Sequence, residues 1–284
     1  MAPDTPSPKD DARAPLPAGR LHGLRSGLLE VVLAPDAGGR IAQLRYDGVA
    51  WLVGEHAGGA GTPAIAWGCY PMVPWAGRIR HGSFTFDGRR RSLPANFDAH
   101  AIHGVGFTRP WHIDCLDVDT ARLSLALPED DYWPFGGRAT QTLHLQPDRL
   151  HLHLSVEAGH QAMPAVIGWH PWFRKPDRLQ FAPGTMYPRD HEGIATLPCV
   201  SPAPGPWDDC FINQADVLLA SAGQQLRIRA DADHWVIYDG APHATCVEPQ
   251  TGPPDGFTLA PNRLEPGQRL EMEVELKWEN RCVR

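Results

Sequence analysis

The sequence lacks a long apolar run, closely paired cysteines and a basic block, and each absence excludes a class of protein. No run of about 18 apolar residues occurs, so no membrane-spanning helix is expected. The six cysteines include no C-x-x-C pair, which argues against a structural zinc ribbon, and no metal site is predicted. Lys plus Arg total 26 against 33 Asp plus Glu, for a net charge of −7, so nucleic acid and anionic membranes are poor candidate partners.

The first residues also lack the apolar stretch of a secretory signal. Residues 1–19 are rich in proline and charge, and we expect them to form a flexible tail. Without an export signal, a cytoplasmic location and free thiols are expected, because disulfides are rare in reducing compartments. Hydrophobic residues make up 42% of the chain, and no shift in composition divides it, so residues 20–284 are predicted to form a single domain.

Turn-forming residues are abundant, since 29 prolines and 28 glycines leave little room for helices of three turns. Between them lie short segments in which apolar and polar residues alternate, as in strands with one buried face. Residues 269–278 are the clearest case, and residues 139–156 contain two such runs joined by a turn at 146–149. Further candidate strands and hairpins lie at 38–48, 83–93, 122–127, 225–230 and 234–240. The pattern predicts an all-β fold, either a sandwich or a barrel.

Fourteen histidines are present, but most lie in uninformative contexts. His151 and His153 alternate with leucines, and we interpret them as the solvated face of a strand. His103 lies in the glycine-containing segment AIHGVGF, and His170 lies in GWHPWF beside Trp172. Sugars present apolar C–H faces that pack on aromatic rings, and their hydroxyls need polar partners. The GWHPWF segment is therefore a candidate sugar-binding element, although a lone buried histidine is often only a hydrogen-bonded core residue.

Three further segments carry charged groups in loop-like settings. Glu248 follows a candidate strand and precedes Pro249, so we expect a rigid loop to project it from the strand end. Arg78 stands beside Gly77 and offers a planar set of donors suited to hydroxyl pairs or carboxylates. Asp208 lies in WDDCF between aromatic residues and can accept a hydrogen bond from a sugar hydroxyl. Each of these, taken alone, is also consistent with an ordinary surface residue.

Taken together and in order, these segments resemble the aldose 1-epimerase (galactose mutarotase) family, from about residue 28 to 278. The matching residues are Arg78-Ile79, Gly82-Ser83-Phe84, Asp87-Gly88, Leu93, His103-Gly104, His170-Pro171-Trp172-Phe173, Asp208 through Phe211, Glu248-Pro249-Gln250-Thr251 and Pro254-Asp255. The resemblance implies a large antiparallel β-sandwich, the supersandwich of galactose mutarotases. One position departs from the family, which often has Asn where this chain has Gly77, and this leaves the identity of the sugar open.

The resemblance implies an isomerase that interconverts the α and β anomers of a free hexose. Glu248 would be the general base and His170 the general acid, and no metal or organic cofactor is needed for such proton transfers. We expect an ionised Glu248 and a protonated His170, because attraction across the sugar lowers the pKa of the carboxyl group and raises that of the imidazole. The implied sugar-binding residues are His103, Arg78 and Asp208, to which the aromatic argument adds Trp172.

Two alternative functions stay open. A hexose-6-phosphate 1-epimerase needs cations for the phosphate, and Arg78, Arg80, Arg89, Arg90 and Arg91 form a basic cluster, although a solvated hairpin surface is the simpler interpretation. A non-catalytic sugar-binding module would keep the groove but has no need for both an acid and a base. In each case the expected partner is a small-molecule sugar, and the chain is expected to be a monomer or a homodimer.

Overall fold

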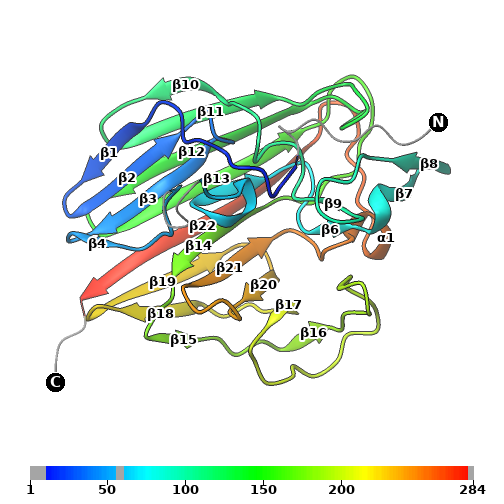
Figure 1. Ribbon diagram of the computed structural model, residues 1–284. Helices are drawn as coiled ribbons and strands as arrows, with labels where there is room; N and C mark the ends of the chain where they lie inside the picture. The colour runs from blue at the N-terminus through cyan, green and yellow to red at the C-terminus, as the bar shows by residue number, and fades with distance from the viewer. Residues whose placement is uncertain (1–10, 56–60, 281–284) are drawn as a thin grey trace.

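The computed structural model describes residues 11–55 and 61–280, and two large antiparallel sheets dominate this part of the chain (Figure 1). The ten-stranded sheet runs in the order β1 (His22–Ser26), β2 (Leu29–Ala34), β3 (Arg40–Tyr46), β5 (Cys69–Met72), β14 (Gly168–Arg174), β21 (Ala244–Gln250), β20 (His234–Tyr238), β17 (Asp208–Ile212) and β16 (Thr185–Tyr187), with β4 (Val49–Ala50) beside β3. The eight-stranded sheet runs in the order β10 (His112–Leu116), β11 (Thr120–Ala126), β12 (Arg138–Gln146), β13 (Arg149–Glu157), β22 (Arg269–Asn280), β19 (Gln224–Ala230), β18 (Val217–Ser221) and β15 (Arg178–Gln180).

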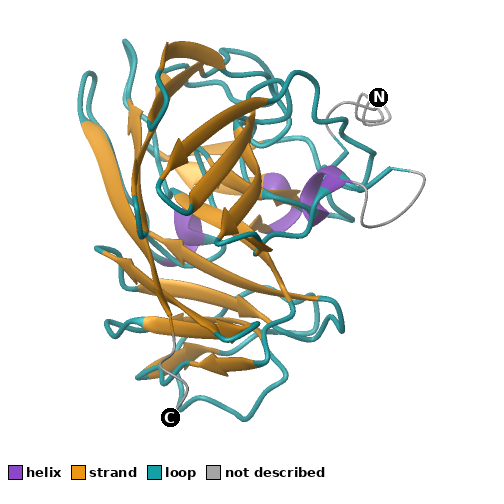
Figure 2. Ribbon diagram, turned by 90° about the vertical axis from the view of Figure 1, so that its left-hand side faces the viewer, coloured by secondary structure: helices purple, strands orange, loops and turns teal. Residues whose placement is uncertain are grey.

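Short elements complete the described fold. Two small sheets pair β6 (Arg78–Ile79) with β9 (Ala101–Ile102) and β7 (Ser83–Phe86) with β8 (Arg89–Ser92). The helical segments are η2 (Ala64–Ala66), η3 (Arg80–Gly82) and α1 (Gly256–Leu259). Figure 2 shows these single turns among loops, beside the strands that make up nearly all the regular structure. The predicted all-β class is confirmed, and the fold is an antiparallel sandwich.

Strict alternation explains why the eight-stranded sheet was predictable. In β22, Met272, Val274 and Leu276 are buried, whereas Glu271 and Glu273, which point to the other face, are exposed. The predicted hairpin at 139–156 is also present, because β12 and β13 pair in register from Arg138–Glu157 to Gln146–Arg149. The buried faces of both sheets contribute to one hydrophobic cluster, which forms the core of the sandwich.

The N-terminal segment is more ordered than its composition suggests. Residues 1–10 lie outside the described residues, but residues 11–19 do not form the flexible tail expected there. The Ala12 side chain is buried, its N–H donates to the carbonyl of Asn96 at 2.9 Å, and Ala18 is buried as well. Arg13 forms an ion pair with Asp98 at 2.6 Å. Small apolar side chains spaced along this proline-rich segment thus let it lie against the sandwich.

A buried arginine connects several loops beneath the central strands. The guanidinium of Arg40, at the start of β3, is fully buried and lies over the rings of Trp67 and Tyr70, at 4.2 and 5.0 Å from their centroids. Its N–H groups donate to the carbonyls of Ala37, Ala64, Trp67 and Phe107. Burial lowers the pKa of this guanidinium to about 9. The four carbonyl partners compensate the cost of burying it and fix the loops around β5.

Candidate active site

Strand register assembles the predicted residues on one face of the ten-stranded sheet. Residues directly opposite each other in an antiparallel pair point to the same face. The register of β14 on β21, with Gly168 opposite Gln250 and Trp172 opposite Cys246, places His170 opposite Glu248. Two cross-strand rows result, one of Cys210, Val236, Glu248, His170 and Tyr70, and one of Asp208, Tyr238, Cys246 and Trp172.

Most residues of these rows line a cavity of ≈ 280 Å³, whereas Tyr70 and Cys246 do not. All six residues singled out in the sequence line it: Arg78, His103, His170, Trp172, Asp208 and Glu248. They come from four strands and one loop that are far apart in the chain, so the fold brings together what the motifs only suggested. The expected position of Glu248 was wrong in one respect, because it lies inside β21 and not on a loop beyond a strand.

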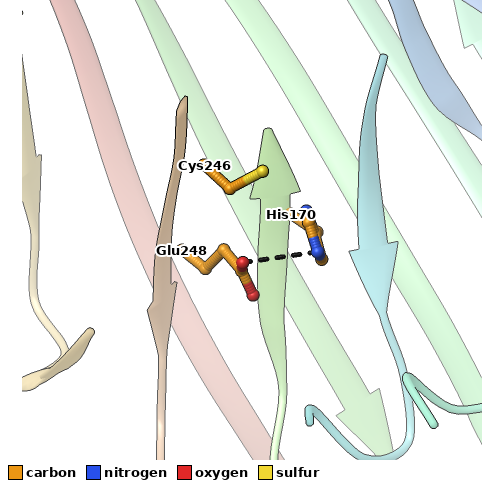
Figure 3. A group of neighbouring side chains, drawn as sticks. All are labelled: His170, Cys246 and Glu248. Carbon is orange, nitrogen blue, oxygen red and sulfur yellow. Dashed lines mark ion pairs between the residues drawn. The ribbon is translucent and has the colours of Figure 1, made fainter. Parts of the chain in front are cut away.

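Glu248 and His170 form a buried acid–base pair. Oε1 of Glu248 lies 3.3 Å from Nε2 of His170, and the residues are only 3% and 6% exposed (Figure 3). Burial raises the pKa of Glu248 well above its ordinary value and lowers that of His170 to about 3. These directions are opposite to those expected across a bound sugar. Here the loss of hydration outweighs mutual attraction, so burial favours the neutral form of both residues.

His103 is held as a neutral hydrogen-bond donor. Its Nδ1 accepts a hydrogen bond from the N–H of Gly77 at 3.3 Å, so the ring proton lies on Nε2. The ring stands edge-on to that of His170, with 4.9 Å between centroids. Burial, and secondarily the nearby His170, lower the pKa of His103 well below its usual value. His103 can therefore donate to a sugar oxygen in the cavity without carrying a charge.

The geometry of Gly77 explains its departure from the family pattern. Its φ is +70°, a left-handed conformation that disfavours most side chains. A Cβ at this position would lie 2.7 Å from Cβ and 2.8 Å from Cα of Pro254. The Asn that is common in the family tolerates the backbone conformation but not this contact. Glycine is thus required here by the loop that carries Pro254.

Arg78 and Asp208 both line the cavity. The backbone carbonyl of Arg78 accepts a hydrogen bond from the N–H of Asp255 at 2.7 Å, and its guanidinium lies 5.5 Å from the ring centroid of Phe97. The carboxylate of Asp208 accepts a hydrogen bond from Arg189 at 2.6 Å. Arg189, which also lines the cavity and reaches Asp209 at 3.0 Å, was missed in the sequence. The neighbouring carboxylates of Asp208 and Asp209 indicate that a cation pairs with them. The local sequence does not show which arginine is that partner.

Aromatic rings complete the site. Trp172 stacks on His170, with 5.6 Å between centroids and 7° between planes. Tyr238 packs edge-on to Trp172 at 5.9 Å and lines the same cavity. The sequence analysis did not single out Tyr238, although its place at the end of an alternating strand gave a weak indication. Together these rings offer an apolar surface for the C–H face of a sugar.

The basic cluster predicted around residues 78–91 is not a single site. Arg80 forms ion pairs with Asp190 and Glu192, and Arg91 lies over the ring of Phe135 at 5.2 Å. The hairpin of β7 and β8 carries Arg89 and Arg90 on an exposed surface. Among the described residues that line the cavity, the arginines are Arg78 and Arg189.

Two further features concern membranes and thiols. In the described part of the chain, no helix is long and apolar enough to cross a membrane. Five cysteines are free thiols, as expected, whereas Cys282 lies outside the described residues. One of them, Cys246, lies beside His170 and Glu248, and these three residues could together hold a metal ion.

Comparison with known proteins places this arrangement in a family. The model of the aldose 1-epimerase family matches residues 22–279. An uncharacterized Escherichia coli protein, YphB, is 32% identical over 156 residues, which cover 54% of this chain and 51% of YphB. A second uncharacterized E. coli protein, YihR, is 32% identical over 108 residues, which cover 36% of this chain and 34% of YihR. The matched segments thus span only about half or less of these curated relatives.

Solved structures share the fold over nearly the whole chain. A candidate aldose 1-epimerase from E. coli K12 superposes with a TM-score of 0.81 at 22% identity, covering 92% of this chain and 99% of that one. A galactose 1-epimerase from Lactobacillus acidophilus gives 0.75 at 19% identity, covering 91% and 94%. At such identities the likeness concerns the fold.

Proposed function

The chain belongs to the aldose 1-epimerase family, and from this we propose that it is a cofactor-independent isomerase that interconverts the α and β anomers of a free hexose. One observation carries the proposal: Glu248 and His170 lie 3.3 Å apart on neighbouring strands and line the same cavity. Mutarotation exchanges protons at two oxygens bonded to the same sugar carbon, the anomeric hydroxyl and the ring oxygen. An acid and a base that lie side by side match this demand.

The pair holds one transferable proton, and its position sets the starting state. Burial keeps it on Glu248 in the sugar-free site, whereas the charge of Arg78 opposes this by favouring the carboxylate. When sugar hydroxyls solvate the pair, the proton passes from Glu248 to His170. Glu248 then removes the proton of the anomeric hydroxyl while His170 protonates the ring oxygen. Each positioned transfer contributes on the order of 10²–10⁴-fold to the rate.

Ring opening gives an aldehyde, whose carbonyl carbon can rotate before the ring closes on the other face. On closure the groups exchange roles: Glu248 returns a proton to the anomeric oxygen, and His170 takes one from the attacking hydroxyl. The surrounding groups hold the sugar during this rotation. His103 donates from Nε2, Arg78 and Asp208 bind hydroxyls, and Trp172 packs on the C–H face.

The direct test compares the wild type with Glu248→Gln by polarimetry on freshly dissolved α-glucose and α-galactose. The amide has the size of the carboxylate but cannot accept the proton, so anomer exchange should fall by at least about 10²-fold while sugar binding by calorimetry is nearly retained. Glu273→Gln, an exposed carboxylate on β22 of the other sheet, is the matched control and should keep full activity. Full activity of Glu248→Gln would refute the assignment.

A free hexose is favoured over a hexose 6-phosphate by the placement of the cations. Of the five clustered arginines only Arg78 lines the cavity, and Arg189, the other arginine among the described residues there, is already paired with Asp208 and Asp209. Competition by glucose 6-phosphate in the polarimetric assay separates the two substrates. A non-catalytic sugar-binding module would instead bind sugar without accelerating anomer exchange. The cytoplasmic location and a monomeric or homodimeric state stay predictions.

A further inference from the structure

Three different donor atoms meet beneath the cavity. The ligand atoms of His170, Cys246 and Glu248 lie within 4.8 Å of one another, and all three residues are buried. Figure 3 shows Cys246 and Glu248 extending from β21 toward His170 on β14. Positions 246 and 248 are two residues apart on the strand, so their side chains point to the same face. The thiol and the carboxyl group therefore lie on the face that carries the imidazole.

A second observation also indicates a ligand at this place. Nδ1 of His170 is buried and has no hydrogen-bond partner among the described residues. Buried polar atoms are nearly always hydrogen-bonded, so this nitrogen leaves bonding capacity unused on the ring of one of the three donor residues. The mechanism proposed above assigns no role to Cys246, which does not belong to the set of residues lining the cavity.

We propose that His170, Cys246 and Glu248 form a site for a thiol-binding divalent ion such as Zn²⁺, and that its occupation switches the isomerase off. A thiolate, an imidazole nitrogen and a carboxylate oxygen are the ligand types that Zn²⁺ takes from proteins. Binding displaces one proton each from Cys246 and Glu248 to solvent. The resulting complex of two anions, one neutral ring and a dication carries no net charge, which keeps the cost of its burial low.

The geometry requires only side-chain adjustment. Zn²⁺ binds sulfur at about 2.3 Å and nitrogen or oxygen at about 2.0–2.2 Å, so tetrahedral donors stand about 3.5 Å apart. Three donors already within 4.8 Å reach this arrangement by moving about 1 Å. Since His170 and Glu248 line the cavity, the fourth position faces it and is open to water or a sugar hydroxyl.

Inhibition follows from the proposed function. The ion takes the Glu248 carboxylate and the His170 ring as ligands, so the carboxylate cannot accept a proton and the ring cannot be protonated, and neither residue can act as base or acid. Mg²⁺ prefers oxygen ligands in octahedral geometry and should neither bind here nor inhibit.

Binding is tested first and independently of activity, by calorimetry with Zn²⁺ and by ultraviolet absorption with Cd²⁺, which gives a thiolate-to-metal band. We expect Cys246→Ala to lose one equivalent of tight binding, with affinity at that site reduced at least about 100-fold, and to lose the Cd²⁺ band. The matched control is Cys69→Ala, which removes a buried thiol on β5 that does not line the cavity and should keep both. Equal binding by wild type and Cys246→Ala, or loss only in Cys69→Ala, overturns the proposal.

Activity supplies the second readout. Zn²⁺ should suppress anomer exchange by the wild type but not by Cys246→Ala, which should retain its metal-free rate. Cys246→Ser, checked by near-ultraviolet circular dichroism for native packing, repeats the test if the alanine variant does not fold. Zn²⁺ binding at Cys246 in a protein without mutarotase activity would refute the proposed function and leave the metal site standing. An active wild type that binds no Zn²⁺ or Cd²⁺ would refute the metal site and leave the function standing.

Discussion

The pKa values of Glu248 and His170 are displaced in opposite directions, so their contributions to the pH dependence of stability oppose each other. Burial raises the pKa of Glu248 above its ordinary value of 4.5 and lowers that of His170 from 6.5 to about 3. Between pH 4.5 and 6.5, an unfolded chain has Glu248 ionised and His170 protonated, whereas the folded pair is neutral. Both states then hold one proton, so the two contributions to the pH dependence of unfolding cancel.

Glu248→Gln removes one side of this cancellation. Only the contribution of His170 remains. Its pKa is lower in the folded than in the unfolded state, so as the pH falls from 6.5 to 4.5 the unfolded chain binds a proton at His170 that the folded protein does not, and unfolding is favoured. The free energy of unfolding of the variant should fall relative to the wild type by up to about 1.4 kcal/mol per pH unit. Urea denaturation of both proteins across this range measures the difference. Parallel stability curves would contradict neutral burial of the pair.

At the scale of elements, the site depends on turns that hold strands close together. Gly77 has φ +70° and lies against Pro254, and its carbonyl and N–H both bond to His103. A side chain at this position therefore displaces the loop that aligns His103 with Arg78. The same positive φ, +69°, occurs at Gly88 in the β7–β8 turn, where an added Cβ has no atom within 4 Å.

Gly77→Asn should consequently destabilise the protein by about 1–3 kcal/mol more than Gly88→Asn, because both pay for the backbone conformation but only the first creates an overlap. It should also weaken sugar binding, whereas Gly88→Asn should not. Thermal unfolding and sugar calorimetry on the two variants check this. Equal effects of the two substitutions would show that positive φ alone decides the choice of glycine at Gly77.

Some strands could be predicted from the sequence and others could not. Strands with one solvated face, such as β12, β13 and β22, alternate and were predictable from the chain alone. Every residue of β21 is buried, so the segment shows no alternation of apolar and polar residues that would identify it as a strand. Glu248 was therefore expected on a loop. Five of the six predicted site residues were proposed from motif order and Trp172 from its aromatic ring, since spacing alone left each one ambiguous. Arg189 reaches the site through tertiary packing, for which the local sequence carries no sign. Cys246 shares a face with Glu248 because residues 244–250 form a strand, which the sequence did not reveal.

Across the whole molecule, stability depends on a few buried polar anchors within the apolar core. Arg40 is the largest of these, because four carbonyl groups from three loops share its guanidinium. Replacing it with methionine keeps much of the volume but leaves those carbonyls without a donor.

Arg40→Met should therefore lower the free energy of unfolding by at least about 3 kcal/mol, since each unsatisfied buried group costs about 1–3 kcal/mol. The comparison is Arg45→Met on the same strand, where the side chain is half-buried and a loss within about 0.5 kcal/mol is expected. Denaturant titration of both variants gives the values. A small effect at Arg40 would mean that water replaces the lost donors.

The position of β14 and β21 within the ten-stranded sheet has a consequence for inactivation. These strands are the fifth and sixth along its hydrogen-bonded path, with β1 and β16 at the edges. Fraying begins at edges and termini, where opening free energies are lowest, while central amides exchange with solvent only when most of the molecule unfolds. Edge strands can thus open without separating the carboxyl–imidazole pair. Heat should abolish turnover only at the temperature of global melting, with no earlier phase of partial loss.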